Sequence, residues 1–250
     1  MNPVSTLGID GFNGASAPNR SAIPTSESDH FLRALTPEQV DCATRCLNMR
    51  VRTFNKGEVL LACTGDTSTL GIMLSGTGQD IRLHANGERT LVDVIETGEI
   101  FGDGWHSPHI LQYDGPKERA IIAATEVQAV FFAPERLHDD TISCSVQSVF
   151  RQEIWRLLLS KQERLRAKIE MLHHRSLRKR ICAFLLTESL RRRQKTFMLV
   201  MSRKELAEYL HADRAALSRE LSNMRKDGLI DYWRNAFSIQ SLSEAKLFPE

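Results

Sequence analysis

Residues 213–226 (DRAALSRELSNMRK) combine basic and hydroxyl side chains with a helical apolar repeat. The apolar positions start at Leu217 and recur four and seven residues later, so the polar residues fall on the opposite side of a helix. That polar side carries Arg214, Ser218 and Arg219. An arginine can bind O6 and N7 of a guanine bidentately, and a serine can contact either base type or a phosphate. The pattern predicts a helix that lies in the major groove of DNA.

A second helix and a tight turn precede this segment. In "SRKELAEYL", Ser202 followed three residues later by Glu205 is a capping box, in which the two side chains satisfy terminal backbone N–H groups. Asp213, after a short connection at residues 211–212, is a suitable N-cap for the next helix. Two capped helices joined by a short turn predict a helix-turn-helix motif.

A two-stranded wing is predicted after the second helix, which ends at Gly228. "IDYW" and "AFSI" flank Arg234-Asn235, and we expect Arg234 at this turn to contact a phosphate. Trp233 and Phe237 are expected to cover the hydrophobic core rather than to stack on bases. The predicted DNA-contacting residues of the motif are Arg214, Ser218, Arg219, Ser222, Ser202, Arg203, Arg225 and Arg234.

The charged residues divide unevenly along the chain, although its net charge is only +2. Residues 151–250 carry 22 Lys and Arg against 12 Asp and Glu, whereas residues 1–150 carry 11 against 19. This asymmetry favours a polyanionic partner for the C-terminal part. No signal peptide is recognisable in the first 20 residues, and no window approaches the roughly 18 apolar residues of a membrane span. We therefore predict a cytoplasmic protein with no membrane partner.

Cysteine and histidine side chains leave several sensor chemistries open. An iron–sulfur cluster needs four thiolates, but the five cysteines are scattered and predict neither a cluster nor a disulfide framework. The candidate haem ligands are His84, His106, His109, His173 and His174. Only His106-x-x-His109 comes near the two-histidine, one-carboxylate metal site of an enzyme. The same "WHSPHILQYDG" insertion is compatible with a pocket for a small organic ligand, or with none. We predict no metal site and leave the cofactor unknown.

The pattern of the chain divides it into four segments. Residues 1–28 are rich in Ser, Gly, Pro and Asn and predict a flexible tail. Residues 29–140 contain short apolar runs separated by glycines, which predicts an antiparallel barrel or jelly roll. Within it, Asn86-Gly87 predicts a two-residue type I′ hairpin turn. Residues 141–175 predict a long helix, and residues 176–250 hold the winged helix-turn-helix.

The long helix carries an apolar stripe and contains no proline or glycine. A stripe of this length favours a parallel helix pair in a homodimer, and the alternative is packing on its own barrel. Lys161 and Lys168 border the stripe, either as part of an adjustable interface or as lysines that extend along the surface to water. The predicted interface residues are Ile154, Leu158, Leu165, Ile169 and Leu172.

The segment "SRKELAEYLHADRAALSRELSNMRKDGLIDYWRNAFSI" resembles the winged helix-turn-helix of the Crp/Fnr (cyclic-AMP-receptor/FNR) family of bacterial transcription factors, and most closely its clostridial-type branch. The order of barrel, long helix and winged domain extends the resemblance to nearly the whole chain after residue 30. The family's recognition helix contains Arg-Glu-x-x-x-Arg, which corresponds to Arg214 and Arg219 with Ala215 in place of the acid. Because alanine cannot accept from cytosine N4, we expect a different operator sequence.

The resemblance also implies where an effector would bind in the barrel. Family members that bind cyclic nucleotides hold the phosphate with a Gly-Glu segment and an Arg-Ser pair. Arg119 is followed by Ala120 here, so the hydroxyl is missing and cyclic AMP is not the expected ligand. Haem and an iron–sulfur cluster are not expected either. The effector-pocket candidates are Gly98, Glu99, Gly102, Asp103 and Arg119.

Together these features predict an α+β fold. It would consist of a cupin-like, cyclic-nucleotide-binding-type β-barrel, a long dimerisation helix and a C-terminal winged helix-turn-helix. The expected function is that of a homodimeric, sequence-specific DNA-binding transcription regulator, without enzymatic activity, controlled by a signal in the barrel. Its expected partners are double-stranded DNA, a second copy of the chain, RNA polymerase and a small-molecule effector. The alternative is a metal-dependent cupin-type enzyme, or a haem or metal sensor barrel, with an accessory DNA-binding domain.

Overall fold

The computed structural model describes residues 37–63, 69–84, 86–102, 119–138 and 147–241. The chain forms two compact units, residues 1–161 and 162–250. The division falls within one helix, α3 (Gln147–His173), which is therefore shared between the units. The predicted tail at 1–28, Asp103, the His106-x-x-His109 pair and Cys144 lie outside the described residues. The predicted segment boundaries stay predictions.

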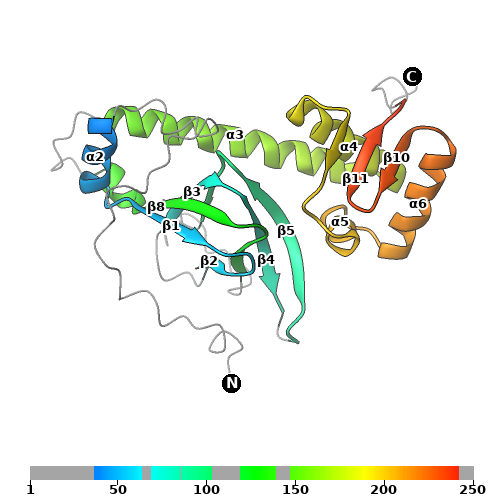
Figure 1. The fold of residues 1–250 in the computed structure, drawn as a ribbon, viewed down its shortest axis with the longest axis horizontal. Helices are drawn as coiled ribbons and strands as arrows, with labels where there is room; N and C mark the ends of the chain where they lie inside the picture. The colour runs from blue at the N-terminus through cyan, green and yellow to red at the C-terminus, as the bar shows by residue number, and fades with distance from the viewer. Residues whose placement is uncertain (1–36, 64–68, 85, 103–118, 139–146, 242–250) are drawn as a thin grey trace. The chain divides into compact units, whose positions relative to one another are not determined.

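The first unit contains two four-stranded antiparallel sheets, which confirms the predicted β fold (Figure 1). One sheet has the order β1-β8-β3-β6 and the other the order β2-β7-β4-β5. A helix, α2, precedes the strands and begins at Pro37, as the Thr-Pro-Glu sequence suggests. The elements are α2 (Pro37–Cys46), β1 (Arg50–Phe54), β2 (Val59–Cys63), β3 (Leu70–Ser75), β4 (Thr77–Leu83), β5 (Arg89–Glu96), β6 (Ile100–Gly102), β7 (Arg119–Ala123), β8 (Val127–Phe132) and the 3₁₀ helix η3 (Pro134–His138).

The hairpin between β4 and β5 exists, but its predicted two-residue type I′ turn is wrong. The His84 N–H donates to the Glu88 carbonyl at 2.9 Å, and the Gly87 N–H donates to the His84 carbonyl at 2.8 Å. The loop therefore has three residues between His84 and Glu88. Gly87 has φ 81°, whereas Asn86 does not have the positive φ that a type I′ turn requires. The extra residue is accommodated because glycine supplies the one left-handed position of a three-residue loop.

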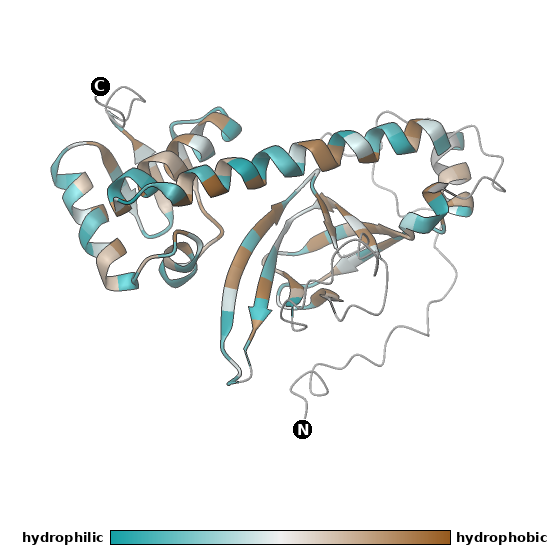
Figure 2. Cartoon of the chain, turned by 180° about the vertical axis from the view of Figure 1, so that it is seen from behind, coloured by the Kyte–Doolittle hydropathy of each residue, from teal (hydrophilic) through white to brown (hydrophobic). Residues whose placement is uncertain are grey.

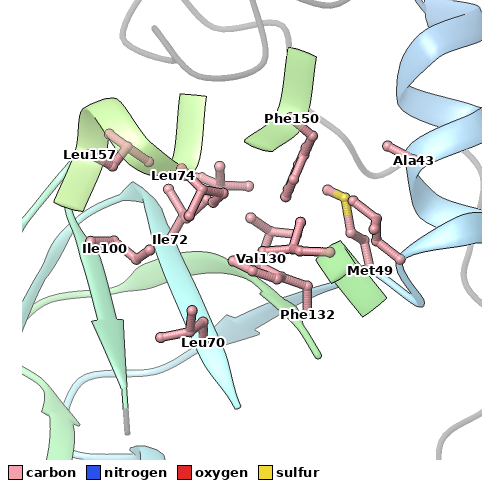
Figure 3. Packing of buried hydrophobic residues seen from close by; sticks show 13 residues of the cluster. Ala43, Met49, Leu70, Ile72, Leu74, Ile100, Val130, Phe132, Phe150 and Leu157 are labelled. Atoms are coloured by element: carbon pink, nitrogen blue, oxygen red, sulfur yellow. The ribbon is translucent and has the colours of Figure 1, made fainter. Parts of the chain in front are cut away.

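Among the described residues of this unit, two buried clusters connect the sheets and helices. One lies between the two sheets and includes Phe54, Phe101 and Phe131, whose rings meet edge to face. The other lies between the first sheet and the helices α2 and α3. Figure 3 shows Ala43 of α2 and Phe150 of α3 facing the same group of strand residues. This second cluster fixes α2 and the start of α3 on the sheet.

Some apolar residues of α3 are buried against the barrel, whereas others are exposed. Ile154 is buried in the cluster against its own barrel, and Leu158 packs partly against it. The packing alternative is therefore correct for Ile154, which is removed from the predicted dimer interface. Leu165 and Ile169 are exposed, at 42% and 56% of their surface. Figure 2 shows apolar (brown) segments recurring along α3 between polar (teal) ones. The exposed residues remain available for a partner helix.

The second unit contains the end of α3, three further helices and one small sheet. The elements are α4 (Leu177–Arg192), β9 (Thr196–Met198), α5 (Arg203–Tyr209), α6 (Arg214–Lys226), β10 (Ile230–Trp233) and β11 (Ala236–Ile239). The sheet has the order β10-β11-β9. The helices bury Ile181, Leu185, Leu206, Leu217, Leu221 and Met224, and Leu210 at the end of α5 is also buried. Within the described ranges, no helix has the length and apolar character needed to cross a membrane.

Candidate nucleic-acid interface

The start of α5 is fixed by the predicted capping box. The Glu205 N–H donates to Ser202 Oγ at 3.3 Å, and the Ser202 N–H donates to the Glu205 carboxylate at 2.6 Å. Both side chains act within three residues of each other, which is why the sequence pattern was sufficient to identify them. The Ser202 hydroxyl oxygen therefore already accepts the capping hydrogen bond. A DNA contact by Ser202 would have to leave that bond in place.

The start of α6 is fixed in the same way. The Asp213 carboxylate accepts hydrogen bonds from the N–H groups of Ala215 and Ala216, each at 2.9 Å. The preceding turn contains His211 with φ 48°. Arg180 of α4 donates to the carbonyls of Leu210 and His211, at 2.6 and 2.9 Å. The turn between the two helices is thus held by a residue about 30 positions earlier, which the sequence pattern did not reveal.

A second arginine of α4 anchors the back of α6. Arg178 donates to the carboxylates of Glu220 at 2.5 Å and Asp227 at 2.7 Å. These two acceptors raise the pKa of the Arg178 guanidinium. Below this ion pair, the buried side of α6 consists of Leu217, Leu221 and Met224, as predicted. Packing and charge therefore both fix the buried side of the helix.

The opposite side of α6 is exposed and positively charged. Among the described residues, the guanidinium groups of Arg214 and Arg219 have no hydrogen-bond or ion-pair partner, and the same holds for Arg234 at the wing turn. Ser218 Oγ donates to the Arg214 carbonyl at 2.9 Å, which leaves the hydroxyl oxygen able to accept. This arrangement can offer charged donors to base edges and phosphates without first breaking an internal ion pair.

Arg203, predicted to contact DNA, is instead built into the base of the wing. Its guanidinium lies over the rings of Tyr232 and Phe237, 4.7 and 4.8 Å from their centroids. It also donates to the Arg234 carbonyl at 2.6 Å, at the turn where Arg234 has φ 51°. Burial lowers the pKa of the Arg203 guanidinium. The group therefore supports the wing turn from inside the domain, and a DNA contact by Arg203 stays a prediction.

Arg225 and Ser222 also reach the wing. Arg225 pairs with Asp231 of β10 at 2.8 Å, and its guanidinium lies 5.6 Å from the ring centroid of Tyr232. Ser222 Oγ is 3.3 Å from the Tyr232 hydroxyl. Tyr232 therefore connects α5, α6 and the wing. The predicted DNA-contacting set thus divides into exposed arginines and residues that position the wing.

The expectation for the two wing aromatics is correct for one and wrong for the other. Phe237 is 1% exposed and covers the core, but Trp233 is 74% exposed. Tyr232 pairs with Phe237 across the hairpin, whereas Trp233 pairs with Ala236. Because side chains alternate between the two faces of a strand, Trp233 must point away from the helices once Phe237 points toward them.

The effector candidates of the barrel are engaged in local contacts. Arg119 of β7 donates to both carboxylate oxygens of the buried Asp80 of β4, with Nε at 3.2 Å. The Glu99 carboxylate accepts from the Glu96 N–H at 2.9 Å, in the turn that also contains Gly98. Gly102 has φ 112°, and a Cβ there would lie 2.4 Å from the Thr69 carbonyl oxygen. Gly102 is therefore needed because no side chain fits its backbone position. The charge of Arg119 is already compensated by Asp80.

A metal-binding cluster is not found in the described ranges, since no three or more His, Cys, Asp or Glu side chains gather there. Two thiols lie side by side in α2, with Sγ of Cys42 and Sγ of Cys46 3.8 Å apart. Cys182 of α4 is buried, and burial raises the pKa of its thiol to about 11. That thiol therefore stays protonated near neutral pH.

Comparison with known proteins identifies the C-terminal unit. Residues 179–247 match the model of the Crp-like helix-turn-helix domain. A search of curated proteins finds no match. This range covers α4 from its third residue onward, α5, α6 and the wing, so the predicted resemblance is confirmed where its motifs lie.

Solved structures share the architecture of nearly the whole chain. FixK2 from Bradyrhizobium japonicum is 16% identical, with a TM-score of 0.59 over 80% of this chain and 95% of that one. A CooA mutant from Carboxydothermus hydrogenoformans is 16% identical, with a TM-score of 0.62 over 79% of this chain and 86% of that one. A Eubacterium rectale protein described as a transcriptional regulator of the Crp/Fnr family is 18% identical, with a TM-score of 0.57 over 89% and 97%. The fold is thus Crp/Fnr-like, and the clostridial-type branch stays a prediction.

Proposed function

We propose, from the premise that the chain has a Crp/Fnr-like fold and carries a Crp-like helix-turn-helix domain, that it is a sequence-specific DNA-binding transcription regulator. The observation that carries the proposal is the exposed side of α6. Its arginines, Arg214 and Arg219, have no partner among the described residues, while the helix itself is capped and anchored from behind. Side chains near the start of such a helix are the ones that contact base edges in the major groove.

The regulator would act as a homodimer through α3. Once Ile154 is assigned to its own core, the remaining positions Trp155, Leu158, Gln162, Leu165, Ile169 and Leu172 follow alternating steps of three and four residues. That spacing is the heptad repeat of a two-stranded coiled coil. Trp155 is 65% exposed, which supports its inclusion in place of Ile154. Glutamine at one inner position would weaken the pair and help to set its register.

A signal in the N-terminal unit would control DNA binding by favouring one of two arrangements of the dimer. The proposal includes RNA polymerase as a partner and a cytoplasmic location. Lys161 pairs with Asp93 of β5 at 2.9 Å, and Lys168 lies 3.8 Å from the ring centroid of Tyr209. These contacts would connect each half of α3 to the unit to which it belongs. Catalytic activity is not part of the proposal, and metal analysis of the purified protein tests that exclusion.

The direct experiment is selection of bound duplexes from a random double-stranded DNA pool by the full chain. We expect an enriched two-fold symmetric site with half-sites about one helical turn apart, because a dimer with two recognition helices imposes that spacing. Binding should weaken steeply with salt, as phosphate contacts release counterions. A pool that stays random after repeated selection at moderate salt would contradict the proposal, and an enriched single half-site would contradict the dimer.

A further inference from the structure

Two thiols of α2 lie side by side next to the cluster that holds the start of α3. Sγ of Cys42 and Sγ of Cys46 are 3.8 Å apart, one helical turn from each other. Both residues are half-buried, and neither is in a disulfide. Their neighbours Ala43 and Leu47 are buried, so the two sulfurs lie at the edge between the core and solvent. A reagent can therefore reach them without unfolding the helix.

The spacing of the sulfurs favours a bridging centre over a disulfide. A tetrahedral centre with bonds to sulfur of about 2.3 Å holds two thiolates about 3.8 Å apart. A disulfide needs its Cβ atoms about 3.5–4.5 Å apart, whereas residues one turn apart on a helix keep them about 5–6 Å apart. Closing a disulfide would thus require the end of α2 to open. Binding a bridging centre would require little movement.

We propose that Cys42 and Cys46 form a two-thiolate site for a soft, thiophilic metal or metalloid centre. Soft thiolate ligands select such centres over hard cations. With a trivalent arsenical the reaction is a condensation. The arsenic–oxygen double bond of an arsenoxide breaks, two arsenic–sulfur bonds form, and the oxygen leaves with the two thiol protons as one molecule of water. Neither arsenic nor sulfur changes oxidation state, so no oxidant is needed.

The site lies where it can affect the proposed regulation. Cys42 packs against the cluster that contains Ala43 of α2, Leu47 directly after it and Phe150 of α3. Figure 3 shows Ala43 and Phe150 in that cluster, together with the strand residues Val130 and Phe132. A centre bound to both sulfurs would hold the last turn of α2 rigid against the first turns of α3. This regulatory role rests on the proposed function, but binding at the two thiols does not.

The test is titration of the reduced full chain with phenylarsine oxide, followed by intact mass and thiol counting. We expect one arsenic per chain, the loss of two titratable thiols, resistance to excess monothiol and removal by a dithiol. Cys42→Ser and Cys46→Ser should each weaken binding at least tenfold. Cys182→Ser is the matched control and should bind like the wild type, because Cys182 is a buried cysteine of α4 and is not part of the Cys42–Cys46 pair. Parallel titration with Cd²⁺ distinguishes a metal ion from a metalloid as the preferred centre.

Several results would overturn the proposal. Full binding by Cys46→Ser, or its loss in Cys63→Ser or Cys144→Ser, would mean that another pair of cysteines holds the arsenic. A Cys42–Cys46 disulfide that forms readily with hydrogen peroxide, without arsenical binding to the reduced chain, would make the pair a redox site instead. DNA affinity of the loaded chain is measured separately and should change at least threefold. An unchanged affinity would remove the regulatory role, and a chain that never binds DNA would overturn only the proposed function.

Discussion

Arg119 in the barrel and Arg219 in the recognition helix have opposite electrostatic surroundings. Arg119 pairs with the buried carboxylate of Asp80, across two neighbouring strands. Arg219 has no ion-pair partner among the described residues, and the nearest acid of its own helix, Glu220, is taken by Arg178. One domain compensates its candidate ligand-binding charge internally, and the other leaves its charge unpaired. The difference indicates that the exposed side of α6, and not the barrel around Arg119, has unpaired positive charge to offer a polyanion.

The same comparison explains why cyclic nucleotide binding is not expected. A phosphodiester at Arg119 would have to replace the Asp80 carboxylate and leave that buried acid without its cation, which is costly. A DNA phosphate or guanine at Arg219 replaces only water. The comparison also extends to α3, where Ile154 is satisfied by its own core and Ile169 remains exposed. Charged side chains without an ion pair in their own domain, and apolar side chains that stay exposed, are the ones expected to contact a partner.

The largest expected effect comes from the exposed part of α3. The double variant Leu165→Glu, Ile169→Glu should be monomeric at micromolar concentration, because four like charges would meet in the seam of the dimer. DNA affinity should fall more than a hundredfold, since one half-site contact is lost. Sedimentation measures the oligomeric state. Leu190→Glu is the control, as this exposed leucine of α4 lies off the seam.

A dimer that survives the double substitution would show that α3 is not the interface. Leu158→Glu is the less selective variant, because Leu158 also packs partly against the barrel core. Its effect on oligomeric state would therefore be mixed with an effect on folding, and thermal unfolding must accompany it.

A smaller effect on DNA affinity is expected from Arg203. This residue lies within the DNA-binding domain, but its guanidinium already contacts Tyr232, Phe237 and the Arg234 carbonyl. Arg203→Ala should lower the free energy of unfolding by about 1–3 kcal/mol, through loss of the ring contacts and of the hydrogen bond to the Arg234 carbonyl. DNA affinity should fall about tenfold because the wing turn loses its support. The slope of affinity against salt should not change, since a phosphate contact would contribute about one unit to it. A reduced slope would show that Arg203 contacts a phosphate, and Arg203 would then count among the DNA-contacting arginines.

The smallest effect on DNA binding is expected in the barrel. Asp80→Asn should destabilise the chain by about 1–3 kcal/mol, because the half-buried Arg119 loses its charged partner. Affinity for DNA in the absence of an effector should stay within twofold. Chemical denaturation and DNA titration measure the two quantities. If Asp80→Asn instead gained tight binding of cyclic AMP, the ion pair would be a block on a functional nucleotide site.

Local interactions were predictable from the sequence, and long-range ones were not. The caps at Ser202 and Asp213 act within three residues, so their spacing defines them. The Asn86-Gly87 turn was misassigned because the same dipeptide fits loops of two and three residues. Trp233 was misplaced because the alternation of a short strand does not reveal which face meets the helices.

Contacts between distant segments have no signal in a single sequence. Arg178 meets Glu220 and Asp227 more than 40 residues away, and Arg119 meets Asp80 at a separation of 39. The polar residues of α6 were correctly placed on its exposed side, but their division into exposed arginines and wing supports required the position of Tyr232.

Base-resolved site selection with Arg219→Ala beside Arg225→Ala tests the central claim most directly. Arg219→Ala should lose about 1–3 kcal/mol on the selected site and its preference at one base pair in each half-site, while binding to non-specific DNA is largely kept. Arg225→Ala should keep the same base preferences, because Arg225 pairs with Asp231. An Arg219→Ala variant that selects the wild-type site with equal stringency would contradict the assignment of α6 as the helix that recognises DNA sequence.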